Sequence, residues 1–169
     1  KIIEDQMGVK WDWDAYWKNA EMYNQMAECK VEKWEVNDTD YPQVCGAALA
    51  LQREFEFMGA ACLDPYMLKT DIEVTKMMHK GYEHDKALDA NKPKYRCLVW
   101  ACPAHYYTNF TCWADLCWGV RCVNDMEAML SYLPITIGDE EQAMKDLARC
   151  YERMMMRSHT NGGYVNLLD

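Results

Sequence analysis

The sequence predicts a single all-α domain, a disulfide-stapled bundle of about five helices formed by residues 1–169. Three observations favour this class. Apolar residues recur at spacings of three and four in several segments, no sustained period-two alternation occurs, and nine cysteines are spread along the chain. Half of the residues are hydrophobic and 27% are charged, which excludes a disordered tail or a fibre. No apolar run approaches the roughly 18 residues of a membrane span.

The first helix is expected from Asp12 to Trp34. At 100° per residue, most of its apolar side chains fall in one sector, and a smaller set falls on nearly the opposite side. A helix that is apolar on two faces is usually packed between neighbours. The larger set is Trp13, Tyr16, Trp17, Ala20, Tyr23, Ala27, Val31 and Trp34, and the smaller set is Met22, Met26 and Cys29.

The second helix is expected to begin at Pro42, because proline suits the first helical turn. It carries an apolar stripe at spacings of three and four: Val44, Ala48, Leu51, Phe55, Met58 and Cys62. A third helix is expected over residues 71–89. Gly81 weakens this helix by about 1 kcal/mol relative to alanine.

Residues 95–123 are expected to form an irregular or short-helical segment that is rich in cysteine and tryptophan. A short helix over residues 125–133 follows, with Asp125 as its cap. Asp139 and Gln142 then resemble the capping box of a final helix. One face of that helix carries Ala143, Met144, Leu147, Cys150, Tyr151 and Met154, and the lone β-like triplet is residues 135–137.

The cysteines are expected to act as structural cross-links, because they are dispersed along the chain. An oxidising compartment would allow up to four disulfides and leave one thiol, either buried and unreacted or bridging to a second copy in a disulfide-linked dimer. The sequence does not choose among the pairings. The candidates are Cys29, Cys45, Cys62, Cys97, Cys102, Cys112, Cys117, Cys122 and Cys150.

Two sequons, at Asn37 and Asn109, also favour a secreted glycoprotein. The alternative compartment is the mitochondrial intermembrane space. Cys102, Cys112 and Cys122 are each separated by nine residues, which resembles the spacing in accessory proteins of that space.

Zinc is the chemical alternative to disulfides. Thiolates and an imidazole within one short segment are the ligands that structural zinc prefers, although spacings of four lie at the loose end of its range. Disulfides explain more of the cysteine positions than zinc does, and they need only one assumption. No metal or cofactor is therefore expected. The zinc candidates are Cys97, Cys102, His105, Cys112, Cys117 and Cys122.

The net charge of −9 disfavours nucleic-acid binding, which draws on clustered lysine and arginine. None of the common catalytic motifs occurs, so an enzyme is the least favoured class. The sequence instead predicts a secreted, non-enzymatic binding protein that engages a protein partner through exposed tryptophan and tyrosine. The alternatives are a carrier of a hydrophobic small molecule and an accessory subunit of a mitochondrial intermembrane-space assembly.

Overall fold

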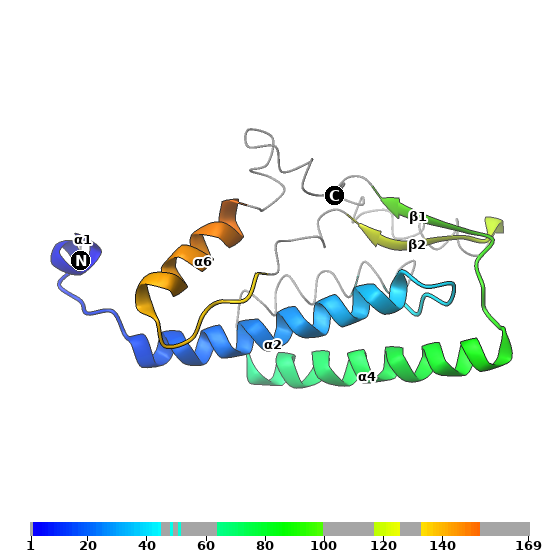
Figure 1. Ribbon diagram of the computed structural model, residues 1–169, viewed down its shortest axis with the longest axis horizontal. Coiled ribbons are helices and arrows are strands. Elements are labelled where there is room, and N and C mark those ends of the chain that lie inside the picture. The colour runs from blue at the N-terminus through cyan, green and yellow to red at the C-terminus, as the bar shows by residue number, and fades with distance from the viewer. Residues whose placement is uncertain are drawn as a thin grey trace.

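The computed structural model describes residues 2–44, 48, 51, 64–99, 117–125 and 133–152. The long helix α2 is the centre of this part of the chain, with α4 along it, α6 against its first half and a small sheet near its end (Figure 1). The elements, in chain order, are α1 (Ile2–Met7), α2 (Trp13–Asn37), α4 (Pro65–Leu88), β1 (Tyr95–Val99), β2 (Val120–Asp125) and α6 (Glu140–Glu152).

Helix α2 confirms the expected first helix and its two packed faces. Asp12 caps it by accepting a hydrogen bond from the backbone N–H of Ala15 at 2.9 Å. Ala20 is buried in the half that packs against α6, whereas Met26 is buried on the other side. Val31, expected in the core, is 40% exposed.

Helix α4 begins earlier than the expected third helix. The Asp64 carboxylate accepts from the backbone N–H of Tyr66 at 2.8 Å, and Pro65 occupies the first turn. The helix ends at Asp89, which adopts a left-handed backbone with a φ of 49°. α4 lies beside α2 and runs in the same direction (Figure 1). The expected second helix falls mostly outside the described residues, although Ala48 and Leu51 are helical.

The all-α prediction is wrong for residues 95–99 and 120–125, which pair as a two-stranded parallel sheet. Both strands contain β-branched or aromatic residues, YRCLV in β1 and VRCVND in β2. They are too short for a period-two pattern to stand out among cysteines and aromatic residues. The register pairs Cys97 with Cys122 and shifts between Cys97 and Leu98. Asp125, expected as a helix cap, ends β2, and residues 126–132 lie outside the described part of the chain.

Helix α6 confirms the expected final helix. Asp139 accepts from the backbone N–H of Gln142 at 3.0 Å, as a cap does. The Gln142 side chain does not complete a capping box, because it donates to Asp146 at 2.7 Å. Before the helix, the Asn24 amide donates to the Ile135 carbonyl and accepts from its N–H, both at 2.8 Å. These two hydrogen bonds hold the segment that precedes α6 against α2.

The disulfide-stapled five-helix bundle is a wrong prediction. Among the described residues, no two cysteines are joined by a disulfide. Most of the described cysteines lie on separate elements, because Cys29 is on α2, Cys150 is on α6 and Cys117 precedes β2, whereas Cys97 and Cys122 are register partners in the sheet. Cys45, Cys62, Cys102 and Cys112 lie outside the described residues.

The helices that the structure describes include none that is both long and apolar enough to cross a membrane. This agrees with the expectation from the sequence.

Candidate functional site

The first eleven residues expose a series of large apolar side chains, which we call the N-terminal apolar surface. Ile2 is 80% exposed and Ile3 is 64% exposed, although such side chains are usually buried. The other members are also open to solvent. They are Met7, Val9 and Trp11, with exposed fractions of 69%, 53% and 47%.

A local turn gives this surface a defined shape. Helix α1 ends at Met7, and Gly8 has a φ of 66°, a conformation that glycine adopts without strain. The Glu4 carboxylate then accepts from the Trp11 backbone N–H at 2.9 Å, and this bond lowers the pKa of Glu4. The surface is therefore a folded turn and not an extended strand of chain.

Aromatic rings connect this surface to the core. The Trp11 ring lies 6.0 Å from Trp13 and 5.8 Å from Tyr16, measured between centroids. Trp13 stacks on Trp17 at 5.1 Å, and Tyr16 meets Trp17 edge-on at 5.2 Å. Such pairs are worth about 0.5–1.5 kcal/mol each beyond area burial. The exposed tryptophan thus stands on a rigid aromatic base.

The aromatic seam is the contact between α2 and α6 beneath that base. Its centre is the buried cluster of Ala20, Ile135 and Ala143, and Ala143 is fully buried. Tyr16 and Trp17 pack against this centre, as do Tyr23 and Leu147.

One polar atom in the aromatic seam lacks a hydrogen bond. The Tyr16 hydroxyl is buried and has no partner among the described residues. Its pKa is raised, chiefly by burial and also by the nearby Asp146 and Cys150. The hydroxyl is therefore held in its neutral form, and its ring serves the seam by packing.

The polar seam is the contact between α2 and α4, and it is built from Cys29, Lys33, Asp71 and Thr75. Lys33 and Asp71 form an ion pair whose side chains are 1% and 2% exposed. Burial raises the pKa of the Cys29 thiol, and the Thr75 hydroxyl donates to the Asp71 carbonyl at 2.8 Å. Lys33, Asp71 and Thr75 are buried, whereas Cys29 is partly exposed. Their arrangement suits holding α4 on α2.

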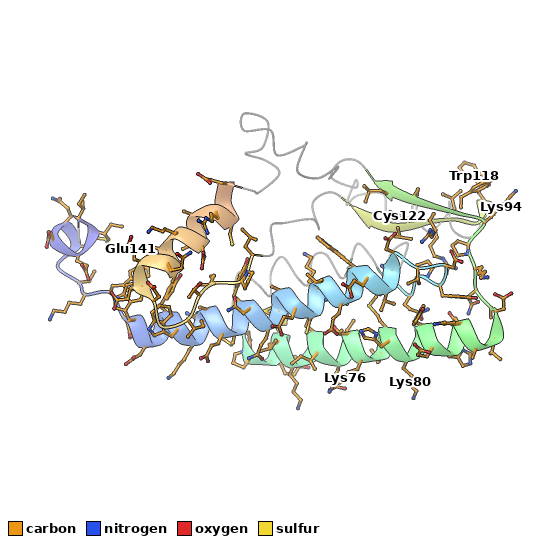
Figure 2. The ribbon with its side chains drawn as sticks, in the orientation of Figure 1. Lys76, Lys80, Lys94, Trp118, Cys122 and Glu141 are labelled. Atoms are coloured by element: carbon orange, nitrogen blue, oxygen red, sulfur yellow. The ribbon has the colours of Figure 1, made fainter. Side chains whose placement is uncertain are left out.

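A second exposed group of side chains lies at the opposite end of the molecule, on the sheet. We call Lys94, Tyr95 and Trp118 the sheet tip, and Figure 2 shows Lys94 and Trp118 together there. Tyr95 is 58% exposed and Trp118 is 54% exposed. The Lys94 ammonium lies 5.3 Å from the centroid of the Tyr95 ring.

The structure places the cysteines expected as cross-links in different parts of the described chain. Cys97 and Cys122 are neighbours in the sheet, whereas Cys29 and Cys150 belong to the polar and aromatic seams. The Tyr23 hydroxyl lies 3.6 Å from the Cys150 sulfur. No group of three metal-ligating side chains occurs within the described ranges, and the zinc candidates Cys102, His105 and Cys112 fall outside them.

Asn37, a glycosylation candidate, is only 4% exposed. Its amide donates to the carbonyls of Val44 at 2.8 Å and Val123 at 3.0 Å. Its oxygen accepts from the backbone N–H groups of Gln43 and Val44, both at 3.0 Å. In the folded chain this side chain ties α2 to a loop and to β2. Asn109 lies outside the described residues.

The N-terminal apolar surface was missed by the sequence reasoning, which began its first helix at Asp12. A signal was present, because Ile3 and Met7 are four residues apart and share a helical face. No family model, curated protein or solved structure matches the chain.

Proposed function

We propose that this chain is a binding protein that engages a protein partner through the N-terminal apolar surface. The observation that carries the proposal is the exposure of five large apolar side chains within eleven residues. Soluble monomers rarely expose contiguous apolar patches, and those that do usually use them for interaction.

The support beneath the surface strengthens the proposal. Tryptophan is enriched among the residues that dominate binding energy. Binding is also less costly in entropy when the contacting group is held in place beforehand. Trp11 meets both conditions, because it is 47% exposed and its ring contacts Trp13 and Tyr16.

The other predicted functions receive less support from the geometry. A carrier of a hydrophobic molecule would use its aromatic side chains to line a cavity, yet Trp13, Tyr16 and Trp17 contact one another. Secretion stays a prediction that now depends on the sequon at Asn109, because the disulfide bundle is wrong and the Asn37 side chain is buried. The proposed binding function applies equally to a secreted protein and to one in the mitochondrial intermembrane space.

Photo-cross-linking tests this function. A photoreactive amino acid replaces Trp11 in one variant and Lys80, an exposed residue of α4, in the control (Figure 2). In an extract of the source cells, we expect the probe at position 11 to give one dominant protein adduct that the probe at position 80 does not give. Equal labelling from both positions would contradict the proposal.

A further inference from the structure

The two exposed ends of the molecule carry opposite charge. Residues 2–18 and 139–145, around the N-terminal apolar surface, hold seven acidic side chains and three lysines, a net charge of 3 − 7 = −4. Residues 90–98 and 117–123, around the sheet tip, hold Lys92, Lys94, Arg96 and Arg121, and Asp38 and Asp89 pair with two of these cations, which gives a net charge of 4 − 2 = +2. The acidic set is Glu4, Asp5, Asp12, Asp14, Asp139, Glu140 and Glu141.

Packing brings both parts of the acidic set to one end. Ala143 of α6 packs against Ala20 of α2, with Tyr16 and Trp17 beside them. The first turn of α6 therefore lies near the beginning of α2, and Figure 2 shows Glu141 at that end. Carboxylates from two separate segments therefore lie at the same end of the molecule as the N-terminal apolar surface.

Acids from neighbouring segments lie close to two of the cations at the sheet tip. Asp38 lies 3.8 Å from Arg96, and Asp89 lies 2.7 Å from Lys92. Lys94 lies over the exposed Tyr95 ring, so the tip offers a cation beside aromatic surface.

At the sheet tip, the backbone of Gly119 lies close to Lys94. Gly119 has a φ of 65°, and a Cβ atom on it would lie 3.2 Å from the Cβ of Lys94. The Tyr95 N–H donates to the Gly119 carbonyl at 3.0 Å. Lys94, Tyr95 and Trp118 are thereby held at one end of the sheet.

These charges decide which partner suits the N-terminal apolar surface. Nucleic acid and anionic lipid would be repelled by its carboxylates, and so would the same acidic end of a second copy. The sheet tip of a second copy instead brings Lys94 with two exposed aromatic rings. Charge complementarity therefore favours contact between unlike ends.

We propose that the chain associates with itself head to tail, with the sheet tip of one copy bound to the N-terminal apolar surface of the next. This inference rests on the proposed function and names its partner. The two surfaces lie at opposite ends of the long axis (Figure 1). A head-to-tail dimer therefore still has one unoccupied N-terminal apolar surface and one unoccupied sheet tip. Contacts between unlike surfaces build rings or open filaments.

Mixing two blocked variants tests the arrangement. Trp11→Ser blocks the N-terminal apolar surface and Trp118→Ser blocks the sheet tip, and masses are measured by sedimentation velocity. We expect the average mass of the wild type to rise with concentration over about the micromolar range, as for a small interface. Each variant alone stays monomeric, whereas their equimolar mixture forms a dimer and nothing larger.

Three further variants test whether a loss of association comes from misfolding and not from the blocked surface. Ile3→Ser and Lys94→Glu repeat the two blocks without removing a tryptophan, and each is expected to weaken association at least about tenfold. Met77→Ser removes an exposed methionine of α4, which is 64% exposed, and is expected to associate like the wild type. High salt is expected to dissociate the mixed dimer, because part of the contact is electrostatic.

Two outcomes would overturn the head-to-tail contact: a wild type that stays monomeric at about 100 μM, or a mixture that stays monomeric while the wild type associates. The proposed function fails separately. A monomeric wild type that still gives a specific adduct with another protein from position 11 would keep the binding role and reject self-association.

Discussion

The polar seam and the aromatic seam occupy the two halves of one helix and are built from different chemistry. Between α2 and α4, the buried side chains include Lys33 and Asp71. Between α2 and α6, the centre is made of Ala20, Ile135 and Ala143. Charge pairing is directional and costly when broken, whereas apolar packing depends on volume and shape. We infer that the first seam fixes the register of α4, and the second supplies a rigid base for Trp11.

The largest expected effect comes from breaking the ion pair of the polar seam. Asp71→Ala leaves the Lys33 ammonium buried without its partner, and we expect the free energy of unfolding to fall by about 3–5 kcal/mol. Urea denaturation measures the change. Replacing both residues, as Lys33→Met with Asp71→Leu, is expected to recover most of this loss, because neither charge of the pair is then left buried alone.

A surface pair on the same helix provides the control. Lys76 and Glu73 form an ion pair at 2.8 Å with exposed side chains, so Glu73→Ala is expected to cost less than about 1 kcal/mol. If Asp71→Ala costs no more than Glu73→Ala, the polar seam does not depend on its charges.

The aromatic seam should respond to volume instead. Ala143→Leu inserts three carbons at a fully buried position, and we expect a loss of about 1–3 kcal/mol from overpacking. Ala148→Leu makes the same change on the exposed side of α6, where an effect within about 0.5 kcal/mol is expected. Thermal unfolding measures the loss of stability in both variants. Equal losses would contradict the packing explanation, because the change in helix propensity is the same in both.

Gly81 of α4 lies against the side chain of Gln43. A Cβ atom at this position would lie 2.1 Å from Oε1 of Gln43, whose amide donates to the Tyr41 carbonyl and the Asp85 carboxylate. In a Gln43→Ala background, Gly81→Ala should gain about 1 kcal/mol from helix propensity. With Gln43 present, we expect the clash to cancel this gain. A double-mutant cycle that gives no coupling energy would show that Gln43 does not restrict this position.

The smallest expected effect is a pH dependence at the rim of the aromatic seam. Asp146 accepts hydrogen bonds from the hydroxyl and backbone N–H of Thr136 and from Gln142, and these bonds lower its pKa. A lowered folded-state pKa gives stability that is present above the unfolded value, about 3.9, and is lost as the pH falls below it. Asp146→Asn should therefore make stability fall less steeply between about pH 5 and pH 3. An unchanged slope would contradict this assignment.

The sequence predicted the helices better than the contacts between them. The cap at Asp139 and the helical spacing of apolar residues were enough to place α2 and α6. These features are local, so a single stretch of sequence determines them.

The remaining features depend on residues far apart in the chain. Lys33 is 38 residues from Asp71, and no local pattern shows that the two charges are buried together. The pairing of β1 with β2 is likewise non-local, and strands of five and six residues carry little periodicity. Cysteine number favoured cross-links, but disulfides require Cα atoms within about 7 Å, and spacing in sequence does not supply that distance.

We propose that the N-terminal apolar surface serves contact with another protein and not the stability of the fold. The direct test combines Ile2→Ser, Ile3→Ser and Met7→Ser in the chain that carries the cross-linker at position 11, and measures the thermal midpoint and the adduct yield. We expect the midpoint to stay within about 1 °C and the adduct to disappear, because these side chains are exposed. A midpoint lowered by about 4–8 °C with an unchanged adduct would contradict the claim.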